Sequence, residues 1–210
     1  MPILDATGVV PSPDALAAAE LALRAGEVVV LPTDTVYGVA VDPRRPHAVD
    51  RLFALKRRPR DAPLAVLVER PQQGLEWADL ARAHRRTADA LRRFWPGGLT
   101  AVLPRAPGLD VDLGTAGDTI GIRCPAHPVP RALAGRIGPL AVTSANLRGA
   151  ETPPTAAAVA AQLELDDRVV VLDGGPCTGA ASTVVDFTGA EPSLVREGAV
   201  PWTAVHALLL

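Results

Sequence analysis

The sequence predicts an α/β fold built on a twisted mixed sheet, in which parallel and antiparallel strands are flanked by helices. Short β-branched and apolar runs alternate with amphipathic helical segments along the chain, as is typical of this class. Several connections between successive strands are too short for a crossover helix, so some neighbouring strands must be antiparallel. No internal repeat or long linker interrupts the 210 residues. We therefore expect one domain over residues 1–210, with no additional C-terminal domain.

The first predicted elements surround a polar turn. Ser12 is typical of a helix N-cap and Gly26 of a helix end, so a helix is expected between them. Two β-branched runs, residues 28–31 and 36–41, are expected to be strands that flank the turn Pro32-Thr33-Asp34-Thr35. Open α/β sheets bind ligands at the ends of buried strands. The hydroxyls and the carboxylate of this turn are therefore candidates for a binding site.

A second polar loop is expected between a helix over residues 46–56 and a strand over residues 64–68. Pro59 disfavours helical geometry at the residue before it, so residues 56–63 are expected to form a loop. Lys56 ends the helix and is the only lysine among 21 lysine and arginine residues. A compact ammonium reaches a phosphate or a carboxylate as a point charge where a planar guanidinium does not fit, so this position is a candidate for a specific role.

The remaining elements alternate in the same way. Residues 79–95 have an apolar face and an arginine-rich face, which predicts an amphipathic helix that ends before Pro96. We interpret the arginines as a solvent-facing stripe, with an RNA-facing stripe as the alternative. The other predicted helices span residues 127–137, 155–163 and 201–210, and the other predicted strands span residues 99–103, 119–123, 140–143, 169–172, 183–187 and 193–196.

Composition argues against several classes of function. The formal net charge is −2 and the pI is about 6.1, which argues against tight non-specific nucleic-acid binding by the whole surface. Cys124 and Cys177 lack metal-binding spacing and are expected to be reduced thiols, as in a cytoplasmic protein. No stretch has the pattern of a signal peptide or a membrane span, so no membrane partner is expected.

Polar residues recur at the ends of the predicted strands and indicate a pocket for an anion. An unpaired arginine is costly at a buried strand end, so three arginines and the one lysine there point to a negatively charged ligand. The residues concerned are Thr33, Thr35, Lys56, Arg58, Thr119, Arg123, Ser144, Asn146, Ser182, Thr183 and Arg196. The sequence has no P-loop, dinucleotide, G-x-S-x-G or H-E-x-x-H motif. The pattern favours a reaction that depends on positioning and charge neutralisation, such as phosphoryl or nucleotidyl transfer.

Seven short motifs, in order along essentially the whole chain, resemble the YrdC-like threonylcarbamoyl-AMP synthases of the short, single-domain bacterial type. The motifs are Leu31-Pro32-Thr33-Asp34-Thr35-Val36-Tyr37-Gly38, Lys56-x-Arg58-Pro59 with Pro63-Leu64, Trp95-Pro96-Gly97-x-Leu99-Thr100, Arg123-x-Pro125-x-His127-Pro128, Ser144-Ala145-Asn146, Ser182-Thr183-Val184-Val185-Asp186 and Leu194-x-Arg196-x-Gly198.

The resemblance implies that L-threonine, bicarbonate or CO2, and ATP become threonylcarbamoyl-adenylate and pyrophosphate. A downstream tRNA threonylcarbamoyl transferase complex would then modify tRNA adenosine, and a weak contact with tRNA itself is a further expectation. Mg2+ would arrive with ATP, and no separate metal site is expected. The implied site residues are Thr35, Arg123 and Ser182 for threonine, Arg58, Thr119, Ser144, Asn146, Thr152 and Arg196 for ATP, and Lys56 and Arg58 for catalysis.

Two positions depart from the family pattern. Ala62 stands where the loop after Arg58 often carries an asparagine, and Leu67 stands where the next strand often carries a histidine facing the amino acid. Both departures bear on contacts with the substrates more than on membership of the family.

Three alternatives accompany the synthase hypothesis. One is an RNA-binding paralogue that acts in tRNA or ribosome maturation without synthesis, and another is a globular α/β domain with solvated arginines. The third is a carbamoyl-transfer domain of hydrogenase maturation, although such domains belong to larger chains with zinc-type cysteine clusters. The joint presence of Lys56, Arg58, Ser144, Asn146 and Arg196 favours the enzyme.

Overall fold

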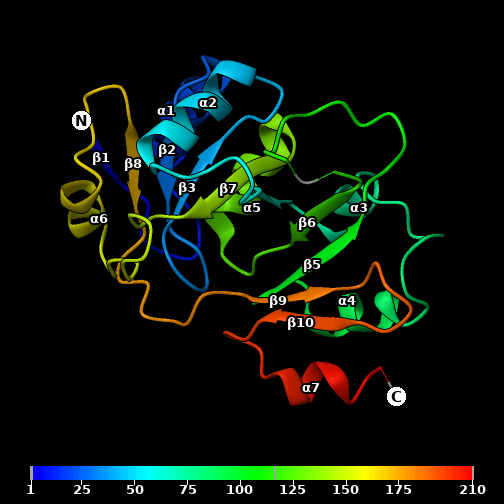
Figure 1. Cartoon of the computed structure of the whole chain (residues 1–210). Helices are drawn as coiled ribbons and strands as arrows, with labels where there is room; N and C mark the ends of the chain where they lie inside the picture. The colour runs from blue at the N-terminus through cyan, green and yellow to red at the C-terminus, as the bar shows by residue number, and fades with distance from the viewer. Residues whose placement is uncertain (1, 116, 210) are drawn as a thin grey trace.

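The computed structural model describes residues 2–115 and 117–209, and the ten strands found there form a single sheet (Figure 1). The strands are β1 (Ile3–Asp5), β2 (Val29–Leu31), β3 (Gly38–Val41), β4 (Ala65–Leu67), β5 (Leu99–Pro104), β6 (Thr119–Arg123), β7 (Leu140–Ser144), β8 (Val170–Asp173), β9 (Thr183–Asp186) and β10 (Ser193–Arg196). Their order in the sheet is β1-β8-β2-β3-β7-β4-β6-β5-β9-β10. The pairs β1–β8, β2–β8, β4–β6 and β5–β9 are parallel and the others are antiparallel, which confirms the predicted mixed sheet.

Side-chain caps define where several helices begin. Ser12 Oγ accepts the Ala15 N–H at 3.4 Å, and His127 Nδ1 accepts the Val129 N–H at 3.2 Å. The helices are α1 (Pro13–Arg24), α2 (Pro46–Leu55), α3 (Pro71–Leu75), α4 (Thr87–Phe94), α5 (Pro128–Ile137), α6 (Ala156–Gln162) and α7 (Trp202–His206). None of the helices in the described ranges is long and apolar enough to cross a lipid bilayer.

The predicted helix over residues 79–95 is wrong in its first half, because only Thr87–Phe94 is helical. The Asp79 N–H donates to the Pro104 carbonyl at 2.8 Å, and the His84 N–H donates to the Phe187 carbonyl at 2.8 Å. These long-range backbone bonds hold residues 79–86 against β5 and the end of β9, and they override the helical periodicity.

Smaller differences concern the chain ends and one short helix. The sequence pattern did not predict β1 or α3. The predicted C-terminal helix is confined to Trp202–His206, and its predicted last residue, Leu210, lies outside the described residues.

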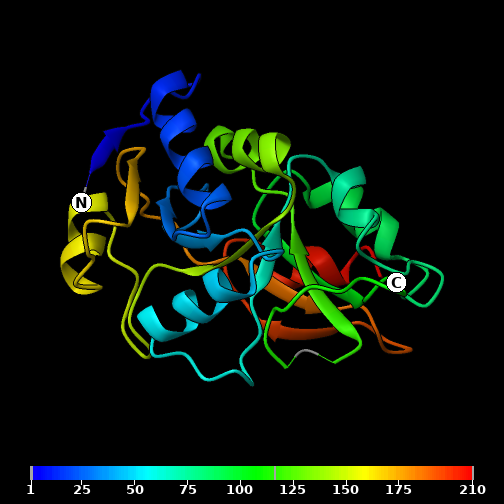
Figure 2. The same ribbon diagram turned by 90° about the horizontal axis from the view of Figure 1, so that it is seen from above.

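The two faces of the sheet bury separate apolar cores, because successive strand side chains point to opposite faces. On one face, Leu23 of α1 and Leu133 of α5 pack with strand residues such as Leu31 and Leu140. On the other face, α2, α4, α6 and α7 pack with the alternate strand residues. Figure 2 shows α1 and α5 on one side of the strands and α2 and α6 on the other. The pocket described below lies on the face of α1 and α5.

The segment after β10 packs directly against the chain that precedes β9. A Cβ atom on Gly198 would overlap the carbonyl oxygen of Ala181 and lie 2.9 Å from the carbonyl carbon of Ser182. The Gly198 N–H also donates to Thr183 Oγ1 at 2.9 Å. Glycine is therefore required here by the close approach of two backbones.

We expect Gly198→Ala to lower the free energy of unfolding by about 1–3 kcal/mol, because the added methyl group must push the two segments apart. Urea denaturation measures this difference. Gly121→Ala is the matched control, since a Cβ atom there would have its nearest neighbours at 3.7–3.8 Å. A Gly198→Ala variant as stable as the wild type would contradict the packing argument.

Candidate active site

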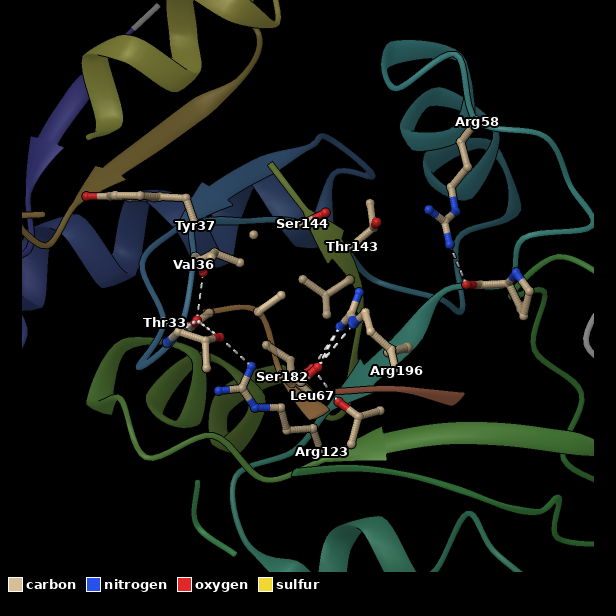
Figure 3. Close-up of a pocket in the computed structure, with 17 residues that line it drawn as sticks. Thr33, Val36, Tyr37, Arg58, Leu67, Arg123, Thr143, Ser144, Ser182 and Arg196 are labelled. Carbon is tan, nitrogen blue, oxygen red and sulfur yellow. Dashed lines mark hydrogen bonds between the residues drawn. The ribbon is translucent and has the colours of Figure 1, made fainter. Parts of the chain in front are cut away.

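A pocket of about 210 Å3 opens on this face of the sheet, across β7, β4, β6 and β5 (Figure 3). Its floor is apolar, because Ala65 and Leu67 of β4 and Val142 of the neighbouring β7 line it, with Ala65 paired to Val142. The residues that line it are Thr33, Thr35, Val36, Tyr37, Gly38, Arg58, Pro63, Ala65, Leu67, Thr100, Arg123, Val142, Thr143, Ser144, Ala181, Ser182 and Arg196.

Arg123 is the most enclosed cation of the pocket, with only 5% of its surface exposed. Its Nε donates to the Gly97 carbonyl at 2.9 Å, Nη1 donates to Thr35 Oγ1 at 2.8 Å, and Nη2 donates to Asp34 Oδ1 at 2.7 Å. Burial lowers the pKa of Arg123, and the nearby Asp34 carboxylate opposes that shift. Three of the five N–H groups of the guanidinium are engaged, which leaves two for a ligand.

The hydroxyls around the floor form two hydrogen-bonded pairs. Thr35 Oγ1 lies 3.0 Å from Thr33 Oγ1, and Ser182 Oγ lies 2.8 Å from Thr100 Oγ1. Arg196 Nη2 donates to the Ser182 carbonyl at 2.8 Å and to Ser182 Oγ at 3.3 Å. Polar groups thus surround the apolar floor on two sides, as in pockets that orient a small polar molecule.

Arg58 lies on the opposite side of the pocket from Arg123 (Figure 3). Its Nε donates to the Ala62 carbonyl at 2.7 Å and its Nη2 to the Pro63 carbonyl at 2.9 Å. Burial lowers the pKa of Arg58, and the positive charges of Arg148 and Arg196 lower it further. Within residues 2–115 and 117–209, no carboxylate lies within salt-bridge distance of Arg58 or Arg196. This side of the pocket therefore carries positive charge that an anion would balance.

Lys56 lies behind the wall that Ser144, at the end of β7, forms in the pocket. Its Nζ donates to the carbonyl oxygens of Ser144 and Asn146 and to Asn146 Oδ1 at 3.2 Å. Asn146 Oδ1 also bonds to Ser144 Oγ and accepts from Thr152 Oγ1 at 3.3 Å. Burial, and to a lesser extent Arg58, lowers the pKa of Lys56 to about 8. The ammonium thus organises the loop after β7.

The structure brings most of the implied site residues together. The roles of these residues in binding and catalysis stay predictions. Lys56, Asn146 and Thr152 form the network behind the wall. Thr119 is at the start of β6, about 13 Å along the strand from Arg123, and does not line the pocket. The implied residues that do line it are Thr35, Arg58, Arg123, Ser144, Ser182 and Arg196.

Sequence reasoning did not assign roles to Asp34 and Thr100. Asp34 was part of a recognised polar turn, but the pattern did not show that it pairs with Arg123, 89 positions away. Thr100 is the hydroxyl in the predicted strand over residues 99–103, and the two-residue period could have placed it on the face opposite Leu99.

Tyr37 lines the pocket, but its side chain supports a neighbouring loop. Its ring points away from the cavity, and its hydroxyl donates to the Gly175 carbonyl at 2.8 Å and accepts the Gly174 N–H at 3.2 Å (Figure 3). Burial raises the pKa of Tyr37 above its usual value, so the hydroxyl stays protonated. The tyrosine thereby ties the start of β3 to the loop after β8.

Known proteins share both the sequence and the geometry. The chain is 44% identical to a Mycobacterium tuberculosis protein over 194 residues, covering 90% of this chain and 86% of the relative. It is 37% identical over 198 residues to Bacillus subtilis threonylcarbamoyl-AMP synthase, covering 92% of this chain and 56% of that protein. The structure of Pyrococcus abyssi Sua5 complexed with L-threonine matches all of this chain at a TM-score of 0.90 and 30% identity. This chain spans 61% of the length of that Sua5 chain.

The family comparison agrees with these likenesses and with the predicted fold. Residues 21–198 match the Sua5/YciO/YrdC family, whose description is "Telomere recombination". The match contains the turn at residues 32–35, the pocket strands and Arg196. The protein therefore belongs to the Sua5/YciO/YrdC family.

Proposed function

We propose that the protein is an L-threonylcarbamoyladenylate synthase. Relatives that match most of the chain are threonylcarbamoyl-AMP synthases, and the Pyrococcus abyssi relative was solved with L-threonine. The observation that carries the proposal is the pocket itself. Arg123, which is held by its protein partners, faces an apolar floor and hydroxyl groups. Arg58 and Arg196 also line the pocket, and neither has a carboxylate partner among the described residues. One end suits an amino acid and the other suits a phosphate chain.

The end at Arg123 is proposed to bind threonine. The two remaining N–H groups of the guanidinium match the two oxygens of an α-carboxylate. The hydroxyls of Thr35 and Ser182 offer partners for the polar groups of the amino acid, and Leu67 offers an apolar contact for its methyl group. Position 67 therefore contributes packing rather than a hydrogen bond.

The end at Arg58 and Arg196 is proposed to bind the nucleotide. The pocket is smaller than the roughly 300–1,000 Å3 of cavities that enclose a whole drug-sized molecule. It would therefore enclose the threonine and the reacting phosphate, while the remainder of ATP extends past the rim. Ser144, on the wall between the two ends, is proposed to contact the phosphate chain.

The reaction follows from this arrangement. The threonine amine attacks the carbon of CO2 or bicarbonate and forms a carbamate. With CO2 the amine releases a proton, and with bicarbonate that proton leaves together with the departing hydroxide as water. A carbamate oxygen then attacks the α-phosphorus of ATP, and the bond to pyrophosphate breaks. Negative charge on the phosphate oxygens is stabilised by Arg58 and Arg196, which are fixed before the substrate arrives. The pocket supplies positioning and charge, as a nucleotidyl transfer requires.

Lys56 is proposed to act as a positioning residue for this reaction. Its ammonium holds the oxygens of residues 144–146 and so fixes Ser144 in the wall. Asn146 and Thr152 complete this support. Thr119 is proposed to act only on a part of the nucleotide that lies beyond the pocket.

Mg2+ is proposed to arrive bound to ATP. The polar groups of the lining are hydroxyls and guanidinium groups, and the Asp34 carboxylate is already paired with Arg123. This donor set fits an ion that keeps most of its ligands on phosphate oxygens and water, with Ser144 Oγ as a candidate protein ligand. When bound, the ion would neutralise part of the charge of the phosphate chain.

The product would pass to a tRNA threonylcarbamoyl transferase complex, and a weak contact with tRNA is part of the proposal. The reaction would take place in the cytoplasm, where ATP and tRNA are found. An RNA-binding paralogue without synthase activity is not favoured, because the relatives above are synthases and the substrate pocket is present.

Pyrophosphate release provides the direct test of the function. With ATP, Mg2+ and bicarbonate, we expect release only when L-threonine is added, because the carbamate of threonine is the attacking group. A coupled pyrophosphate assay measures it. Release that does not depend on threonine, or no release at all, would favour the RNA-binding alternative.

Arg123→Lys tests the threonine end. The lysine keeps the charge beside Asp34 but cannot bond to its protein partners and to a carboxylate together. We expect the KM for threonine to rise about 10- to 100-fold, with a much smaller change in the KM for ATP. Arg168→Lys is the matched control, since Arg168 is exposed and forms its salt bridge with the surface residue Asp166. Equal changes in both KM values would argue against the assignment.

The pH dependence tests the role of Lys56. The pKa of about 8 means that its amine is mostly protonated below pH 8 and mostly neutral above it. Since the protonated form holds residues 144–146, we expect the rate at saturating substrates to fall as the pH rises through about 8. A rate that stays constant up to pH 9.5 would contradict this role.

A further inference from the structure

A tight turn follows the pocket strand β7. The Ala150 N–H donates to the Leu147 carbonyl at 3.1 Å, and Gly149 has a φ of +81°. These features are typical of a type II turn in which Arg148 occupies the first central position. A Cβ atom on Gly149 would meet no atom within 4 Å, so the tip of the turn is open. The exposed Arg148 projects from this tip.

The turn is fixed from the inside by one side-chain amide. Asn146 Nδ2 donates to the Leu147 carbonyl at 2.8 Å and to the Ala150 carbonyl at 2.7 Å. The oxygen of the same amide accepts from Lys56, and Gln162 Oε1 accepts the Leu147 N–H at 3.0 Å. The backbone at the tip is therefore held on both sides. A ligand that contacts the tip residue would have to order only its side chain.

Arg148 adds to the positive charge at the mouth of the pocket. Its charge, like that of Arg196, lowers the pKa of Arg58, so both charges act on the Arg58 guanidinium. Within the described ranges, no carboxylate lies within salt-bridge distance of Arg148. Like charges gathered without a counter-ion cost electrostatic energy, and a multiply charged anion would relieve that cost.

We propose that Arg148 is a further nucleotide-binding residue, which the turn at residues 147–150 presents to the β- and γ-phosphates of ATP beside Arg58. The identity of the ligand rests on the proposed function. The pocket encloses only part of a nucleotide, and the phosphate chain leaves it on the side of Arg58. Arg148 would then contact the group that departs as pyrophosphate and would favour ATP over AMP.

Isothermal titration calorimetry of Arg148→Ala tests the proposal with three probes, ATP, inorganic pyrophosphate and AMP, each with Mg2+. We expect the affinities for ATP and pyrophosphate to fall about tenfold, since one charge-assisted hydrogen bond is lost. The affinity for AMP should stay within about twofold of the wild type. Arg148→Lys should retain most of the affinity for both polyphosphates. Gly149→Ala should weaken ATP binding while keeping Arg148, because its φ is unfavourable for alanine.

Arg168→Ala is the matched control, in which an exposed arginine is removed from the loop before β8 and binding should not change. Wild-type affinity of Arg148→Ala for ATP and pyrophosphate would overturn the proposal. An equal loss of AMP affinity would also overturn it, because it would indicate a distorted loop. The titrations need neither threonine nor bicarbonate. Arg148→Ala could lose polyphosphate binding while the wild type shows no threonine-dependent turnover. That pair of results would refute the proposed function and support this inference.

Discussion

The burial of one guanidinium group constrains much of this structure. Arg123 is almost fully enclosed, and such a charge is tolerated only if it is paired and hydrogen-bonded. Its partners are Asp34, Thr35 and Gly97, which precede it in the sequence by 89, 88 and 26 positions. The requirement to satisfy Arg123 therefore holds the turn after β2, the start of β5 and the end of β6 in one place. The pocket is the space that these segments enclose.

A second buried cation, Lys56, has a different arrangement of hydrogen-bond partners. Lys56 directs its ammonium at three oxygens that belong to residues 144 and 146. A compact, three-fold donor suits acceptors that converge on one point, whereas a planar guanidinium suits partners spread around its edge, as at Arg123. This difference gives a physical reason for a single lysine in a chain whose other basic side chains are mostly arginine.

The sequence was informative where local chemistry decides the structure. Ser12 begins a helix as the predicted capping residue, and the mixed sheet follows from connections too short for crossovers. It was misleading where distant backbone groups decide, as for residues 79–86, where Asp79 and His84 bond to the carbonyls of Pro104 and Phe187 and no helix forms. For the site, polar residues at strand ends predicted the pocket. The pattern could not show that Lys56 lies behind the wall or that Asp34 pairs with Arg123, because both depend on tertiary packing.

The way in which Arg58 is held bears on how such loops diverge among relatives. Its guanidinium is fixed by the main-chain carbonyls of Ala62 and Pro63, and no side chain takes part in these two bonds. Substitution at position 62 can therefore accumulate during evolution without moving the arginine, provided that the path of the backbone is kept. Alignments that score identity at that position would underrate how well the geometry is preserved.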